Sequence, residues 1–359
     1  MIFAKANILY ILLFAVFVFR FASVCEFGVT YCQHRARLYT YRSRELIPPV
    51  LVSLRNSFAR NIGEYMKSPY KELLLGYLLG LNDIKTLSRY NDMLIQTGTI
   101  HVVVVSGFNI SLVCGFIYSL FGNELKLNKI IPAQALALIY VVLVGLNPPA
   151  IRAWIMSTFV IVGRLYGRKG AGTRLLLISL LVMTIADPLL LFSLSFQLSF
   201  TATLGLMLYS PLFESFFKSI LGEKAILVSD LSTTMGAQVL VWPLISYVFG
   251  RISIISPVVN ALVLWTVPPT TIMGFIFLAL TYINGYLSSL FSYVVMLPLY
   301  FFIKVVAFFA NFSRASLDIR IGLPFFISYY VFFICFHIFS RIGSRSDPDR
   351  ALDSKRALT

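Results

Sequence analysis

Long apolar runs recur along most of this 359-residue chain, and they restrict its possible folds more than any other feature. Runs of about 18 residues or more match the thickness of a bilayer when they form helices. Charged residues make up only 13% of the sequence, about half the share in soluble domains. We therefore expect an all-α, polytopic integral membrane protein, a bundle of about ten transmembrane helices.

The apolar runs also predict how the chain is organised. After a first helix within 8–24, the spans are expected at 99–121, 129–146, 150–166, 174–191, 194–212, 231–249, 254–280, 285–311 and 322–340. Two shorter helices are expected before them: an amphipathic one over 50–66, and an apolar one over 73–81 that lies at the interface or packs on the bundle. The expected parts are an N-terminal transmembrane helix (1–24), a basic segment (25–68), a membrane domain (69–340) and a polar tail (341–359).

The net charge of +15 allows two interpretations. One is positive-inside topology together with contact to anionic lipid; the other is a polyanionic partner such as nucleic acid. The short loops carry more Lys and Arg on one side, which favours cytoplasmic N- and C-termini and an extracytoplasmic basic segment. Its candidate contacts to DNA or lipid are Arg35, Arg37, Arg42, Arg44, Arg55 and Arg60.

The predicted span 99–121 carries polar residues, which need protein, water or a substrate beside them in the hydrocarbon region of the membrane. Gly107, Ser111 and Gly115 recur every four residues, a small-residue stripe that favours close helix packing. Ser106 and Asn109 lie on a different face, with His101 nearby. These three either hydrogen-bond to neighbouring helices or, together with Gly107, line or shape a pore, and Ser106-Gly107 is a candidate break in the helix.

Several kinds of catalytic site are excluded by spacing. His101 and Ser106 are five residues apart, about 140° around a helix, so they do not form the nucleophile and base of a protease. The sequence has three histidines and no zinc-like cysteine spacing, and it has no GxxxxGK[ST] loop. We expect no metal, no cofactor and no enzymatic activity.

The predicted span 194–212 presents two polar stripes. Ser199 lies on one of them, and Gln197, Thr201 and Gly205 form the other, about 160° away. We interpret Gly205 as a helix-packing position, and Gln197, Ser199 and Thr201 as residues that line or shape a pore, although packing alone also explains them.

Three further polar residues are candidates for the same role. Gln238 precedes Trp242-Pro243, which predicts a kink. Lys304 is an ionisable residue within a span, or one that reaches a helix end. Arg152 follows Pro148-Pro149 at a helix start, where a cation opposes the helix dipole. An anion is therefore expected beside Arg152: Asp187, a lipid or a phosphate backbone.

Five segments stand in a recognisable order: LLLGYLLGLNDIKTL, TGTIHVVVVSGFNISLV, NPPAIRAWIM, DPLLLFSLSFQLSFTATLGLML and TTMGAQVLVWPLISYVFGRISIISPVVNALVL. Together they resemble the membrane domain of the ComEC-type competence family, over about residues 50–340. His101, Ser106, Gly107 and Asn109 match the family pattern H-x4-SG-x-[NH], and Arg152 matches the arginine after its proline turn. Gln197, Ser199 and Phe200 match its GFQLSF-like run, in which Ser195 replaces the usual glycine.

The resemblance implies an inner-membrane channel that passes single-stranded DNA into the bacterial cytoplasm. The family's OB-like and metallo-β-lactamase-like domains are not expected, because the segments before residue 50 and after residue 340 are too short. Membrane lipid, and a separate DNA receptor, nuclease and cytoplasmic ATPase, are the expected partners. The alternatives are a permease for a small anionic solute, a structural subunit, and a divergent or truncated relative without transformation activity.

Overall fold

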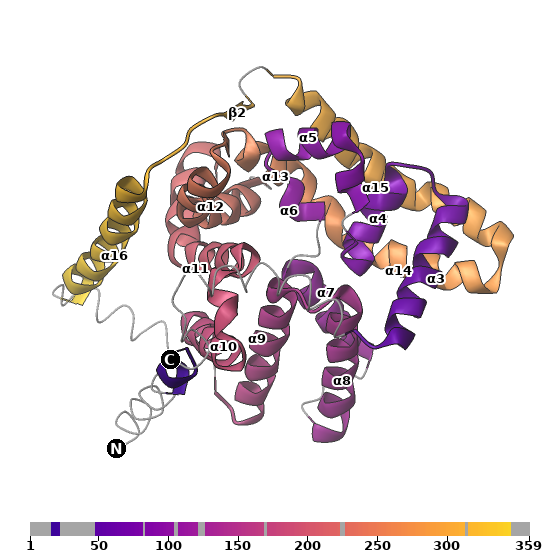
Figure 1. The fold of residues 1–359 in the computed structure, drawn as a ribbon, viewed down its shortest axis with the longest axis horizontal. Coiled ribbons are helices and arrows are strands. Elements are labelled where there is room, and N and C mark those ends of the chain that lie inside the picture. Colours follow the sequence, from indigo (N-terminus) through magenta and orange to yellow (C-terminus); the bar gives the residue numbers. More distant parts are fainter. Residues whose placement is uncertain are drawn as a thin grey trace.

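The computed structural model describes residues 16–21, 47–81, 83–103, 107–120, 126–168, 171–222, 227–312 and 315–345. Nearly all of them are helical, as Figure 1 shows. The strands of this part are β1 (Ile252–Ser253) and β2 (Ser316–Leu317), which pair antiparallel with Ile252 opposite Leu317. The predicted all-α class is confirmed for the described residues.

The helices follow one another with short connections. The α-helices are α3 (Pro49–Tyr65), α4 (Tyr70–Leu79), α5 (Ser88–Gln96), α6 (Ile100–Val103), α7 (Gly107–Leu120), α8 (Leu127–Val144), α9 (Pro148–Leu165), α10 (Gly172–Ala186), α11 (Leu194–Leu221), α12 (Leu227–Phe249), α13 (Ser256–Val263), α14 (Val267–Ile283), α15 (Gly285–Ala310) and α16 (Leu323–Arg345). Three short 3₁₀ turns join some of them: η1 (Asp83–Thr86), η2 (Pro188–Phe192) and η3 (Leu264–Thr266).

Three of the described stretches are long and apolar enough to cross a membrane. They are α8, the α13–α14 stretch and α15, and they correspond to the predicted spans 129–146, 254–280 and 285–311. The other predicted spans stay predictions. The stretch 254–280 is not one uninterrupted helix, because Pro268 and Pro269 lack the backbone donors that would continue α13 through η3.

α4 lies at the centre of the bundle. Its residues Leu73–Leu79 are all buried, as expected for a helix that is apolar on every side. It packs on α14, where a Cβ at Gly274 would lie 2.8 Å from Leu74. Of the two positions predicted for the 73–81 helix, packing on the bundle is confirmed. Gly80 ends α4 at a φ of 65°, a conformation that suits glycine.

The most extensive helix pairing is that of α11 with α12. A Cβ at Gly205 would lie 2.6 Å from the Gly236 carbonyl oxygen, and one at Gly236 would lie 2.7 Å from the Ser210 nitrogen. Two glycines therefore let the two backbones come into contact, as is common where membrane helices pack closely. The predicted packing role of Gly205 agrees with this crossing.

α16 lies at the edge of the molecule, reached by an extended stretch that follows β2 (Figure 1). It packs on α12, and the Tyr329 hydroxyl donates to the Val239 carbonyl at 2.8 Å. That carbonyl has no helical donor four residues later, because position 243 is proline. The contact therefore satisfies a backbone group that the predicted kink would otherwise leave unpaired.

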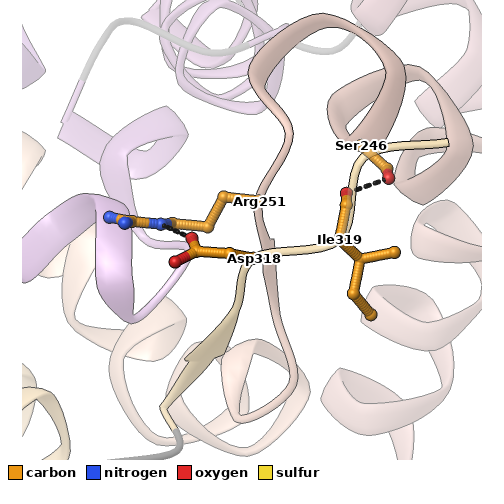
Figure 2. A network of polar contacts seen from close by, with 4 residues as sticks. All are labelled: Ser246, Arg251, Asp318 and Ile319. Atoms are coloured by element: carbon orange, nitrogen blue, oxygen red, sulfur yellow. Dashed lines mark hydrogen bonds and ion pairs between the residues drawn. The ribbon is translucent and has the colours of Figure 1, made fainter.

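The stretch before α16 is hydrogen-bonded to the last turns of α12 and to the loop that follows it (Figure 2). The Arg251 Nε donates to Asp318 Oδ1 at 2.6 Å, and the Ser246 hydroxyl donates to the Ile319 carbonyl at 2.5 Å. The hydrogen bond and the charge of Asp318 raise the pKa of Arg251. Both ion-pair partners are exposed, so the pair contributes about 1 kcal/mol at most.

Candidate functional site

Gly107 of α7 lies against the first turn of α9. A Cβ at Gly107, the first described residue of α7, would lie 3.5 Å from the carbonyl oxygen of Pro149 in the first turn of α9. Pro148 and Pro149 fit the start of α9 because these positions have no helical acceptor for an N–H. The amino end of α9 carries a partial positive charge, which favours an anion at this end of the helix.

Arg152 lies beside this contact. A Cβ at Gly107 would lie only 2.7 Å from Arg152 Nη2, so the glycine leaves the space that the guanidinium occupies. Arg152 Nε donates to the Ser199 hydroxyl of α11 at 2.9 Å, and the guanidinium carbon lies 5.8 Å from the centroid of the Phe200 ring. Three separate stretches of the chain thus converge on one cation.

The Arg152 side chain is buried, with 9% of its surface exposed. Its contacts are to a neutral hydroxyl, an aromatic ring and the sulfur of Met156 at 3.8 Å. No carboxylate of the described residues forms an ion pair with it. A buried cation without a counter-charge is costly, so the arrangement is suited to receive an anionic group.

Asp187, one of the anions predicted beside Arg152, has another role. Its Oδ1 accepts the Leu189 N–H at 2.9 Å and caps η2. An aspartate before a proline commonly closes a turn in this way. The prediction that Asp187 is the counter-ion is therefore wrong for the described structure, which leaves a lipid or a phosphate backbone as the proposed anion.

The polar residues of the predicted span 99–121 separate into different environments. His101, on α6, is exposed, whereas Asn109, on α7, is 1% exposed. Ser106 lies outside the described residues, and so does the proposed helix break at Ser106-Gly107. Asn109 follows Gly107 by two residues on α7, and Gly107 contacts Arg152.

Of the predicted packing stripe of α7, the described residues show a close contact at Gly107. Ser111 is exposed and donates to the Gly107 carbonyl of its own helix at 2.9 Å. No described atom lies within 4 Å of the place where a Gly115 Cβ would be. The described residues do not show packing at Ser111 and Gly115, so packing there stays a prediction; four-residue spacing shows a shared face but not which face meets protein.

The remaining candidates on α11 hydrogen-bond within their own segment. Gln197 Nε2 donates to the Leu191 carbonyl at 2.7 Å, which ties α11 to the end of η2. The Thr201 hydroxyl donates to the Gln197 carbonyl at 2.7 Å. Ser199 is the one of the three that touches Arg152. Ser199 therefore belongs to the site, and a lining role for Gln197 and Thr201 stays a prediction.

Gln238 belongs to a separate buried polar cluster. Its Nε2 donates to the Ser256 hydroxyl at 2.6 Å, and Asn260 Nδ2 donates to the same oxygen at 3.1 Å. Gly98, with a φ of 69°, fits tightly against Ser256. Ser256 and Asn260 were not predicted, although a serine before a proline at a helix start was a signal for them.

The remaining basic candidates are distant from Arg152 in the sequence, and some of them lie outside the described residues. Lys304 is exposed on α15, with its Nζ 5.2 Å from the centroid of the Tyr300 ring. Arg55 is half-buried and Arg60 exposed on α3. The basic candidates Arg35, Arg37, Arg42 and Arg44 lie outside the described residues. Among the residues that the structure covers, no group of His, Cys, Asp and Glu could hold a metal ion.

Comparisons with known proteins give a family match and similar relatives. Residues 79–342 match the family described as "Competence protein". The "ComE operon protein 3" of Bacillus subtilis (strain 168) is 29% identical over 192 residues, which is 52% of this chain and 24% of that protein. An "Uncharacterized protein" of Aquifex aeolicus (strain VF5) is 27% identical over 239 residues, 60% of this chain and 55% of that protein. No solved structure matches.

Proposed function

The chain belongs to the competence protein family, and from this premise we propose that it forms a cytoplasmic-membrane channel for single-stranded DNA during DNA uptake. The observation that carries the proposal is Arg152, a buried cation without a carboxylate partner in the described structure. It lies where Gly107 of α7 meets the start of α9. All its neighbours come from segments that resemble the family.

The chemistry of the site suits one phosphate group at a time. A phosphodiester would accept hydrogen bonds from the Arg152 guanidinium and would be stabilised by the partial positive charge at the start of α9. Phe200, already stacked near the cation, offers an aromatic face for a base. Because Ser199 is neutral, the cation keeps its full charge for the passing strand. A single weak site of this kind allows both entry and release.

A channel of this kind supplies a path and not the driving force. In this proposal the chain is not an enzyme, and it works with a separate receptor, nuclease and cytoplasmic ATPase. Both termini lie in the cytoplasm, and the basic residues between 25 and 68 gather DNA or anionic lipid at the outer mouth. Each of these points can be tested by reporter fusions at the two termini and by crosslinking.

The second candidate function is a permease for a small anionic solute. The same buried cation favours it, since an inorganic or organic anion would also neutralise Arg152. The two functions differ in how affinity depends on ligand length. A strand that contacts several basic residues binds more tightly as it lengthens and loses affinity steeply with salt, whereas a small anion occupies one site.

The test of the proposed function is transformation of the natural host. Deleting the gene should abolish transformation, and complementation with Arg152→Gln should leave it strongly reduced. Arg164→Gln is the matched control, because Arg164 is an exposed arginine in the last turn of the same helix. Full transformation in the deletion strain would overturn the channel proposal and leave the permease and the structural subunit.

A further inference from the structure

Three polar side chains form a buried cluster where α12 packs on α13. Gln238 Nε2 and Asn260 Nδ2 both donate to the Ser256 hydroxyl oxygen, at 2.6 and 3.1 Å. All three residues are more than nine-tenths buried. A buried amide or hydroxyl group is costly unless each of its donors and acceptors has a partner. The pairing of this cluster therefore has to be complete, and it can be followed atom by atom.

Two acceptors and one donor of the cluster have no partner among the described residues. The amide oxygens, Gln238 Oε1 and Asn260 Oδ1, are buried and accept no hydrogen bond from this part of the chain. The Ser256 oxygen already accepts the two amide N–H groups, and its own O–H donates to no described acceptor. Each amide oxygen is bonded to the same carbon as the nitrogen that contacts Ser256, so the unpaired groups lie side by side.

The turn between α5 and α6 closes the cluster from a third side. A Cβ at Gly98 would lie 2.6 Å from the Ser256 hydroxyl oxygen, so the backbone of this turn rests directly on Ser256. The hydroxyls beside Gly98 are already paired: Thr97 donates to the Met93 carbonyl at 2.8 Å, and Thr99 lies 2.9 Å from the Thr97 hydroxyl. A group that completes the cluster must therefore be small and must come from outside these three stretches.

The unpaired atoms determine the chemistry of that group. An anion offers acceptors, and not the donors that two amide oxygens need. A cation cannot accept the Ser256 O–H, and it is disfavoured by the partial positive charge at the amino end of α13 (Ser256–Val263). The group must be neutral, donate two hydrogen bonds and accept one, which a water molecule does.

We propose that one tightly held water molecule binds between Gln238, Ser256 and Asn260. It donates to the two amide oxygens and accepts the Ser256 O–H, so that every polar group of the cluster has a partner. Because Gly98 rests on Ser256, this water joins α12 and α13 to the turn that precedes α6. The site is separate from Arg152 and does not depend on the proposed function.

The test is a crystal structure of the full chain in lipid, at a resolution that shows ordered water, with rubidium chloride as the probe for a cation. A density peak should lie about 2.5–3.0 Å from Gln238 Oε1, Asn260 Oδ1 and the Ser256 oxygen, without an anomalous rubidium signal. A map without this peak, or amide oxygens paired with protein donors, would overturn the proposal. A rubidium signal in the cluster would also overturn it, because the ligand would then be a cation.

A double variant tests whether the two amide oxygens hold the water. Gln238→Leu combined with Asn260→Leu removes both acceptors at nearly constant size, so the peak should be lost while the helical circular dichroism stays unchanged. Gln197→Leu is the matched control and should keep the peak, because the Gln197 amide donates to the Leu191 carbonyl instead. A peak that persists in the double variant would refute the assignment, and the wild-type map decides alone if that variant does not fold.

Discussion

Replacing Gly205 with alanine tests the close contact between α11 and α12. The added Cβ would lie 2.6 Å from the Gly236 carbonyl oxygen and 3.1 Å from that of Ala237. Both are backbone atoms, so no side-chain rotation can relieve the overlap and the two helices must move apart. Overpacking of this kind costs up to about 3 kcal/mol, and the higher helix propensity of alanine returns about 1 kcal/mol. The expected net loss of stability is about 2 kcal/mol.

Gly115→Ala is the matched control on α7. The new methyl group would have no described atom within 4 Å, so only the gain in helix propensity remains, up to about 1 kcal/mol. Unfolding of the two purified variants in mixed micelles, with increasing denaturing detergent, measures the difference, expected to be about 3 kcal/mol. If Gly205→Ala were as stable as Gly115→Ala, the two backbones would not touch where the structure places them.

Two further substitutions test how α16 is held. Tyr329→Phe should cost about 0.6–1.7 kcal/mol, the range for hydrogen bonds between membrane helices, and less in a Pro243→Ala background, where Val239 regains a helical donor. A double-mutant cycle by the same unfolding assay checks this, and equal costs in both backgrounds would refute the role given to Pro243. Asp318→Asn should cost about 1 kcal/mol at most, a loss that disappears at high salt. A larger, salt-independent loss in the same assay would contradict an exposed ion pair.

The sequence was informative where a physical constraint acts on one helix alone. The predicted span 129–146 became α8 (Leu127–Val144), and the predicted amphipathic helix 50–66 became α3 (Pro49–Tyr65). Length, hydropathy and helix-starting prolines are properties of the segment itself. The same reasoning overlooked that Pro268 and Pro269 would divide the 254–280 run, although the prolines were visible.

The candidate site could be predicted only in part, because it forms between segments. The position of Arg152 near a helix start required an anion, but spacing along the chain did not show that Ser199 and Phe200 would be its neighbours. Likewise, the stripe from Gly107 to Gly115 defined a face without its partner. Tertiary contacts depend on how helices cross, and a single sequence does not contain the crossing angles.

The central claim is that Arg152 receives the phosphate of a single strand. Its most direct test is the binding of a fluorescent single-stranded oligonucleotide to the purified chain at several salt concentrations. Losing one phosphate contact reduces the slope of log affinity against log salt by about 0.7. Arg152→Gln should show this reduction, whereas the exposed Arg164→Gln should keep the wild-type slope. An unchanged slope for Arg152→Gln, or no binding by the wild-type chain at low salt, would contradict the claim.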